Sequence, residues 1–209
     1  MRFILNTTVL FSALLLSVTT LAADKKAKPT ADAQTYKIDV KESTINWTGT
    51  KKIGSSHNGA VSIKEGQVEM KKGEITGGTF KVDVASLTDA DLASSPTDQK
   101  KLEGHLKSPD FFNVAKYPEA TFKISKVEKK ADKEFLVKGD LTMIGVTKPL
   151  EFPATITTEN DIVKGEATIK VDRTKWGLKY GSGDFFKELA GDRIINNDFE
   201  LKLNLVAKK

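Results

Sequence analysis

The sequence predicts an all-β fold, an up-and-down antiparallel β-barrel of about eight strands with short helical insertions. Apolar and polar residues alternate with a period of two along most of the chain from Thr35 onward, as in strands with one buried and one wet face. Turn-forming residues separate these runs, and several runs are longer than a β-sandwich, the alternative architecture, usually needs. Many long strands usually close into a barrel because closure removes the unpaired sheet edges.

The first segment in chain order, residues 1–22, is predicted to be a secretory signal peptide. Met1 and Arg2 form a short basic start, an apolar run follows, and Thr20 and Ala22 occupy the −3 and −1 positions of a cleavage site after Ala22. A membrane anchor is the alternative, but polar residues interrupt the run, and a spanning helix needs about 20 mainly apolar residues. Residues 23–34 are predicted to be a flexible leader, and residues 35–209 a single domain.

The alternating runs define the predicted strands. The clearest runs cover 36–40, 80–84, 135–143, 152–156, 163–171 and 199–205, and shorter ones lie near 45–50, 60–63, 68–70 and 121–127. Turns are predicted at 64–66, 71–73 and 159–161, where glycine or an Asn-Asp pair occurs. The inward-facing set mixes large residues with Gly139, Ala154, Gly165 and Ala167. Such gaps suit a narrow tunnel, and the alternative is a solid core of complementary small and large residues.

One region departs from the period of two and predicts helices. Residues 95–98 read Ser-Pro-Thr-Asp, which combines an N-cap serine, a proline at the first helical position and an acidic first turn. Gly104 is expected to weaken this helix or to end it. Residues 108–112 look like a second helix start, and residues 184–190 like a third short helix that Gly191 stops. Helices inserted between barrel strands usually cover an end of the barrel.

The composition excludes several chemistries. The 209 residues include no cysteine, which excludes disulfides, thiolate zinc sites, iron–sulfur clusters and cysteine nucleophiles. His57 and His105 are too few for most imidazole metal sites. We therefore expect no cofactor and no metal. The net charge of +5 is small beside 33 basic and 28 acidic residues, so it does not by itself identify an anionic partner.

Three blocks of sequence resemble the signatures of the YceI-like family. They are the stretch 101–122, which contains Ser-Pro-Asp-Phe-Phe, the stretch 139–149, Gly-Asp-Leu-Thr-Met-Ile-Gly-Val-Thr-Lys-Pro, and the stretch 172–177, Asp-Arg-Thr-Lys-Trp-Gly. The resemblance runs in order from about Tyr36 to the C-terminus. It implies an extended lipocalin-like barrel in the bacterial periplasm, which binds a polyisoprenoid or fatty-acyl-like chain in an interior tunnel and is not an enzyme.

Within that expectation, the period of two selects the residues that would line the tunnel. They are Phe80, Val82, Phe122, Ile124, Phe135, Val137, Leu141, Phe152, Ile156, Trp176, Phe199 and Leu201. Two residues are head-group candidates. Arg173 is one, because a guanidinium matches phosphate or carboxylate, and a structural ion pair with Asp172 is its alternative. His57 is the other, and a turn histidine bonded to backbone is its alternative.

Other functions and partners remain as alternatives at this point. A solid-cored, stress-induced periplasmic protein is one. An enzyme acting on a lipid or a prenyl-phosphate is another, with Asp83, Asp172, His57 and Arg173 as its acid–base groups, but the sequence contains no nucleophile elbow or phosphate loop. The lysine pairs are scattered among acidic residues, so we expect no nucleic acid as partner. They leave open weak contact with anionic membrane surfaces, and the chain is expected to be a monomer or a homodimer.

Overall fold

The structure is a computed structural model that describes residues 33–209. The predicted signal peptide and nearly all of the predicted leader lie outside the described residues. The elements of the described part are β1 (Ala33–Ile38), β2 (Thr44–Lys51), β3 (Ser56–Lys71), β4 (Glu74–Asp89), α1 (Pro96–Lys107), β5 (Glu119–Lys129), β6 (Glu134–Met143), β7 (Val146–Glu159), β8 (Ile162–Asp172), the 3-10 helices η1 (Arg173–Trp176) and η2 (Gly191–Arg193), and β9 (Ile195–Lys208).

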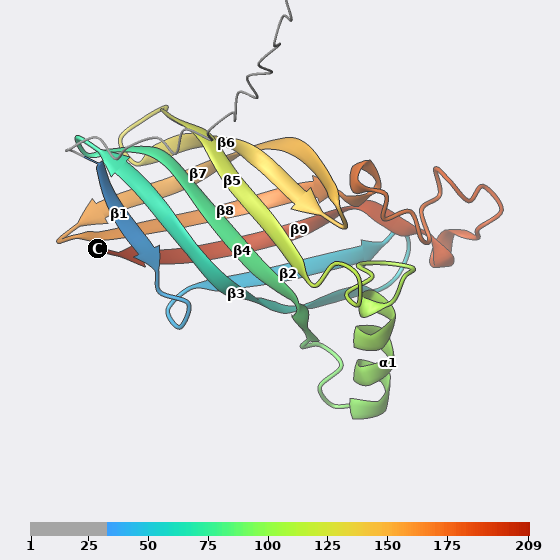
Figure 1. Ribbon diagram of the computed structural model, residues 1–209. Coiled ribbons are helices and arrows are strands. Elements are labelled where there is room, and N and C mark those ends of the chain that lie inside the picture. Colours follow the sequence, from blue (N-terminus) through green and yellow to red (C-terminus); the bar gives the residue numbers. More distant parts are fainter. Residues whose placement is uncertain (1–32) are drawn as a thin grey trace, which may run out of the picture. The chain divides into compact units, whose positions relative to one another are not determined.

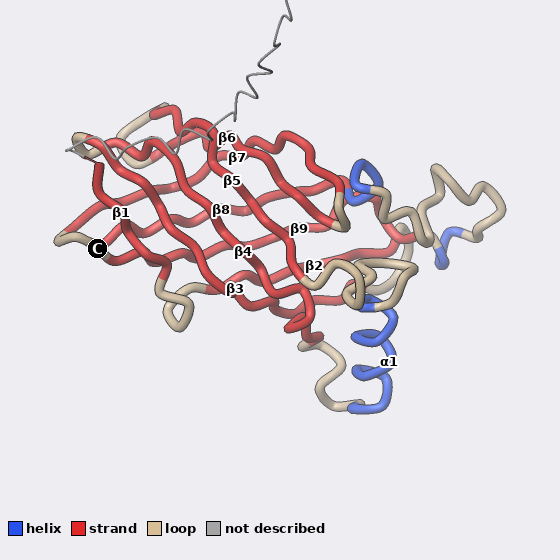
Figure 2. Tube along the Cα trace, in the orientation of Figure 1, coloured by secondary structure: helices blue, strands red, loops and turns tan. Residues whose placement is uncertain are grey.

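The strands form one closed antiparallel sheet (Figures 1 and 2). Each strand from β2 to β8 pairs with the next strand in the sequence. Strand β9 pairs back with β2, which closes the barrel. Strand β1 has the same two neighbours as β2, because it also pairs with β3 and with β9. Tyr36 lies opposite Val68 of β3, and Ile38 lies opposite Ala207 of β9. The predicted up-and-down barrel is therefore confirmed, and the sandwich alternative is not.

The alternation in the sequence places one face of each strand inside the barrel. In β8, for example, Val163, Ile169 and Val171 are buried, whereas Lys164 and Lys170 are exposed. The buried residues form two clusters. One contains Tyr36, Ile38, Ile45, Ile63, Val68, Met70, Val163 and Ala207, and the other contains Ile124, Val137, Met143, Phe152, Ile169, Val171 and Trp176.

Helix α1 begins where the sequence predicts. Ser95 is its N-cap residue and Pro96 its first residue, although the Ser95 hydroxyl bonds to Asp98 Oδ2, 2.8 Å away, rather than to the backbone. Gly104 lies inside the helix and does not end it, because the helix continues to Lys107. Figure 1 shows α1 beside the same end of the barrel as the segment that carries η1 and η2. Within residues 33–209, no helix is long and apolar enough to cross a membrane.

Two predicted helices are turns instead. In 108–112, Phe111 N–H donates to Ser108 O, and Asn113 then adopts a positive φ of 44°, so the chain turns once and leaves helical geometry. In 184–190, turns follow Ser182, and η2 forms only after this segment. Short apolar pairs such as those in these segments fit a packed turn as well as a helix, so the sequence pattern cannot separate the two.

The predicted turns have mixed outcomes. Lys72 and Gly73 adopt positive φ between β3 and β4, and Asn160 and Asp161 do so between β7 and β8, as predicted. The turn predicted at 64–66 is wrong, because these residues lie within β3 at a bulge. Gly66 serves close packing there rather than a turn, since a Cβ on it would lie 2.9 Å from Ile38 Cγ1.

Candidate ligand-binding site in the barrel interior

An apolar cavity of about 150 Å³ lies inside the barrel. Residues from all nine strands line it, and their side chains are aliphatic or aromatic apart from that of Glu166, which is exposed. The cavity contacts members of both buried clusters, such as Val68 of the first and Phe152 of the second. An eight-stranded barrel has an interior just wide enough either to be filled by side chains or to hold one small ligand.

Most residues predicted to line the tunnel also line this cavity. They are Phe80, Val82, Phe122, Ile124, Val137, Leu141, Phe152, Ile156 and Leu201. The remaining three lie elsewhere. Phe135 borders a depression beside the β3–β4 and β5–β6 connections, Phe199 borders a surface groove with Lys170, and Trp176 is buried in η1. That a ligand contacts any of these residues stays a prediction.

Two inward-facing glycines behave differently. A Cβ on Gly139 would lie 2.5 Å from Phe122 Cζ and 2.4 Å from Lys123 O, so the phenylalanine ring already fills the space beside this glycine. A Cβ on Gly165 would meet no atom within 4 Å. The interior is therefore packed solidly at Gly139 and left unfilled at Gly165, which lines the cavity.

Helix η1 follows β8 directly and buries two of its side chains. Asp172 begins it by accepting a hydrogen bond from Thr174 N, 3.0 Å away, and Gly177 ends it with a positive φ of 96°. Trp176 is only 2 % exposed, and its Nε1 donates to Leu141 O at 2.9 Å. The indole therefore packs on the second buried cluster with its one polar atom satisfied, which is a structural role.

Arg173 is buried and bonded to backbone. Its Nε donates to Asn196 O at 3.1 Å, its Nη1 to Leu178 O at 2.5 Å and its Nη2 to Ile195 O at 3.1 Å. Burial lowers the pKa of Arg173, and the nearby carboxylate of Asp172 opposes that shift. Among the described residues Arg173 forms no ion pair, so the structure shows neither the pairing with Asp172 nor a guanidinium free for a head group.

A second cavity, of about 610 Å³, lies at the end of the barrel beside α1, and we call it the end cavity. It is lined by Gly49, Thr50, Lys51, Ser55, His57, Leu102, His105, Phe111, Tyr180, Gly181, Phe186, Leu189, Arg193 and Ile195. The ring centroid of His105 lies 4.7 Å from that of Tyr180 and 5.1 Å from that of Phe111, both edge to face. His105 thus packs among aromatic rings.

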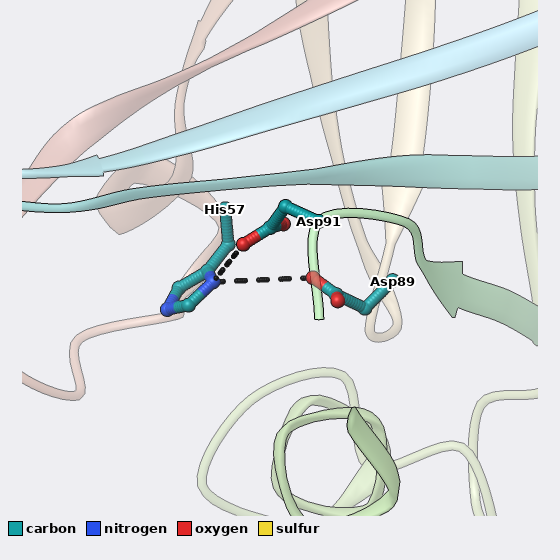
Figure 3. Close-up of side chains that lie close together, drawn as sticks. All are labelled: His57, Asp89 and Asp91. Atoms are coloured by element: carbon teal, nitrogen blue, oxygen red, sulfur yellow. Dashed lines mark hydrogen bonds and ion pairs between the residues drawn. The ribbon is translucent and has the colours of Figure 1, made fainter. Parts of the chain in front are cut away.

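His57 lies in β3 opposite Gly49, not in a turn, and it meets two carboxylates (Figure 3). Its Nδ1 is 2.9 Å from Asp91 Oδ2 and 3.9 Å from Asp89 Oδ2. Burial raises the pKa of the Asp89 carboxyl. Burial also acts to raise the pKa of Asp91, but hydrogen bonds from Asn58 N–H and His57 outweigh it and lower that pKa. Sequence reasoning singled out neither aspartate.

The other acid–base candidates do not join this group. Asp83 accepts a hydrogen bond from Ala85 N–H at 3.0 Å, and Asp172 accepts two from Thr174. Each carboxylate therefore stabilises its own local backbone. In the described part of the chain, the ion pairs of His57 are those with Asp89 and Asp91.

A closed antiparallel barrel with an apolar interior cavity and one helix beside its end defines the lipocalin-like class of β-barrel proteins. The model of the YceI-like domain matches residues 36–207, so this chain belongs to the YceI-like family.

Individual relatives agree with this assignment. A UPF0312 protein of Pseudomonas putida is 34% identical over 178 residues, which cover 81% of this chain and 86% of the relative. The crystal structure of Burkholderia cenocepacia BcnA matches with a TM-score of 0.65 and 22% identity over 82% of this chain and 99% of that chain. A polyisoprenoid binding domain from Saccharophagus degradans matches with a TM-score of 0.58 and 14% identity, covering 83% of this chain and 97% of that chain. These two structural matches establish the fold.

Proposed function

We propose that this protein binds one long apolar chain, of the isoprenoid or fatty-acyl type, inside its barrel and carries it in the periplasm. The observation that carries the proposal is the unfilled space beside Gly165 within a cavity whose inward side chains are all apolar. An apolar cavity of this kind accepts apolar guests, and polar substrates would lose their hydrogen bonds to water there. The similar domain from Saccharophagus degradans is described as polyisoprenoid binding, which supports the same ligand class.

The size of the cavity sets a condition on this function. A volume of about 150 Å³ is below the roughly 300–1,000 Å³ of sites for drug-sized ligands. A long chain therefore requires lining side chains to change rotamer. Phe122 and Phe152 are the bulkiest pair on the wall, with ring centroids 5.6 Å apart, and their movement would lengthen the cavity. Burial of each ligand methylene contributes about 0.8 kcal/mol, which supplies the driving force for binding.

One feature supports the periplasm as the location. The pattern of residues 1–22 is that of a signal peptide, which directs export. Fractionation of the native cells tests the location, because the export account requires processed protein in the periplasmic fraction and cytoplasmic accumulation contradicts it.

We further propose that the tip of the barrel touches anionic membrane surfaces weakly while a lipid is exchanged. This tip consists of the β2–β3 connection and the segment between η1 and η2, in which Ile53 is 63% and Phe185 is 47% exposed. Ile53 belongs to this tip because it approaches Gly191, and Lys52 N–H donates to Ile194 O at 2.8 Å. Apolar side chains beside lysines suit an interface with anionic lipid.

Mass spectrometry of the protein under native conditions tests the proposed function. Protein purified from its own source without detergent should carry one lipid per barrel, and solvent extraction should release a molecule with a long hydrocarbon tail. Protein that is free of lipid, and that stays free of it after incubation with prenyl and fatty-acyl lipids, would support the solid-core alternative instead.

A further inference from the structure

Asp89 lies at the end of β4 and presents a buried oxygen without a partner. Its side chain is 0% exposed, and within residues 33–209 its Oδ2 is the buried side-chain polar atom for which no hydrogen-bond partner exists. The other oxygen, Oδ1, accepts a hydrogen bond from Leu92 N–H at 2.8 Å. Burying an unpaired carboxylate oxygen is costly, so such an atom in a folded protein calls for an explanation.

The unpartnered oxygen points toward two further potential metal ligands (Figure 3). His57 Nδ1 lies 3.9 Å from Asp89 Oδ2 and 2.9 Å from Asp91 Oδ2. One ligand atom from each of these residues lies within 4.8 Å of the other two. The three residues come from β3, from the end of β4 and from the connection to α1. The fold, rather than a local sequence motif, therefore brings them together.

Neighbouring backbone groups hold both carboxylates in position. Asp91 Oδ1 accepts a hydrogen bond from Asn58 N–H at 2.8 Å, which leaves Asp91 Oδ2 turned toward the imidazole. Leu92 N–H orients Asp89 in the same manner. The Glu103 carboxylate of α1 accepts a hydrogen bond from Asp89 N–H at 2.9 Å, which links the helix to the end of β4. Hydrogen bonds of this kind commonly orient the ligands of metal sites.

We propose that His57, Asp89 and Asp91 bind a divalent first-row transition cation of the zinc type through one imidazole nitrogen and two carboxylate oxygens. Bond lengths of about 2.0–2.2 Å around zinc put tetrahedral ligand atoms roughly 3.3–3.6 Å apart, and the two distances from His57 Nδ1 fall on either side of this range. Calcium prefers six to eight oxygen ligands, and magnesium usually retains several waters, so both suit this group less well.

The charges and the exposure of the cluster agree with an open coordination site. A dication balances two carboxylates and gives Asp89 Oδ2 the partner that the protein lacks. The side chains of His57 and Asp91 are 30% and 27% exposed, so a cation can enter and keep a water ligand. His57 also lines the end cavity. A bound cation would therefore fasten β3, β4 and the approach to α1 beside that cavity.

The competing account is a proton shared by the two carboxylates, which the proximity of Asp89 and Asp91 also permits. The two accounts differ in measurable ways. A proton-sharing pair needs no metal and does not give saturable binding at one ion per chain. Asp89→Asn preserves the shape of the residue but removes its charge, so it separates metal binding from packing.

The experiment is a calorimetric titration of the purified, untagged protein with zinc chloride, repeated with cobalt and followed by visible absorption. The background is low because the chain has two histidines and no cysteine. We expect saturation at one ion per chain and a loss of zinc affinity of about 100-fold or more in Asp89→Asn. Even the loss of a residue that only hydrogen-bonds to a metal ligand lowers metal affinity by about 10–100-fold. Urea unfolding without metal establishes that this variant folds.

Asp110→Asn is the matched control. Asp110 Oδ2 lies 3.3 Å from His105 Nε2, so the chain offers a second His–Asp pair, which is not part of a three-ligand cluster in the described residues. This variant should bind zinc as tightly as the unchanged protein. The proposal is overturned if the unchanged protein shows no saturable binding, if Asp89→Asn binds zinc equally well, or if Asp110→Asn is the variant that loses affinity.

Discussion

The ring of Phe122 occupies the space that a side chain on residue 139 would need. A Cβ on Gly139 would lie 2.5 Å from Phe122 Cζ, a distance that real Cβ atoms essentially never show. Phe122 itself lines the interior cavity. The glycine therefore sets where this ring can lie, and through the ring it sets one wall of the cavity.

Replacement of the two inward glycines by alanine should have opposite effects. Gly139→Ala forces Phe122 and the β5 backbone to shift, and we expect it to lower the free energy of unfolding by about 1–3 kcal/mol. Gly165→Ala places a methyl group in open space, and removal of a mid-strand glycine should raise that free energy by about 0.5–1 kcal/mol. Urea unfolding of both variants checks the pair, and equal effects would contradict the difference in packing.

Arg173→Lys tests whether this residue is a structural or a head-group cation. Lysine keeps the positive charge but cannot reach Asn196 O, Leu178 O and Ile195 O together. A carbonyl left without a donor should lower the free energy of unfolding by about 1–3 kcal/mol. We expect lipid affinity to be retained under conditions where the variant is folded. Unchanged stability together with lost lipid affinity would assign Arg173 to the head group.

Glu128 should give the protein a pH-dependent stability at low pH. Lys130, Lys126 and Lys138 surround its carboxylate at 3.0, 3.0 and 3.2 Å and lower its pKa from 4.5 to about 2. Because the folded-state pKa is the lower one, the stabilisation is present above pH 4.5 and is lost as the pH falls through about 2.

The measurement is the difference in urea midpoint between the unchanged protein and Glu128→Gln as a function of pH. This difference should shrink as the pH falls across that window, and added salt should reduce it because the carboxylate is on the surface. Glu151→Gln is the matched control, since Glu151 meets Lys138 at 3.8 Å. A difference that is constant with pH would contradict the role of Glu128.

Phe185→Ser should weaken binding to anionic vesicles if the barrel tip touches membranes. The exposed ring lies 4.6 Å from Lys179 Nζ, so an apolar and a cationic group act at one place. Val40→Ser is the control, because Val40 is 45% exposed on the β1–β2 connection. Co-sedimentation with vesicles should fall for the first variant and not for the second, and binding should weaken in high salt. Equal loss of vesicle binding in both variants would show that the barrel tip is not the membrane contact.

The sequence predicted the barrel well because alternation depends on local residues alone. The runs at 135–143 and 163–171 correspond closely to β6 and β8, and the start of α1 follows from Ser95 and Pro96. Prediction failed where glycine had a packing role. Gly66 resembles a turn residue, but its role depends on Ile38 of another strand, which no local pattern reveals.

The candidate sites depend on contacts distant in sequence, and they were predicted only in part. Alternation gave the cavity-facing side of each strand but not the difference between Gly139 and Gly165, which depends on the ring of Phe122. The cluster of His57 and Asp89 requires the register that places Gly59 opposite Asp89. Strand register is set by turns and bulges along the whole hairpin, and three irregularities in the β3–β4 pairing shift it here.

The central claim is tested most directly by the affinity of the delipidated protein for a fluorescent polyene fatty acid, compared between Gly165→Ile and Thr168→Ile. Both residues lie in β8, but Gly165 lines the cavity and Thr168 is exposed. Isoleucine at 165 should fill the cavity and weaken binding about tenfold or more, at about 0.8 kcal/mol per displaced methylene, while Thr168→Ile binds like the unchanged protein. Equal affinity in all three folded proteins would contradict a ligand inside the barrel.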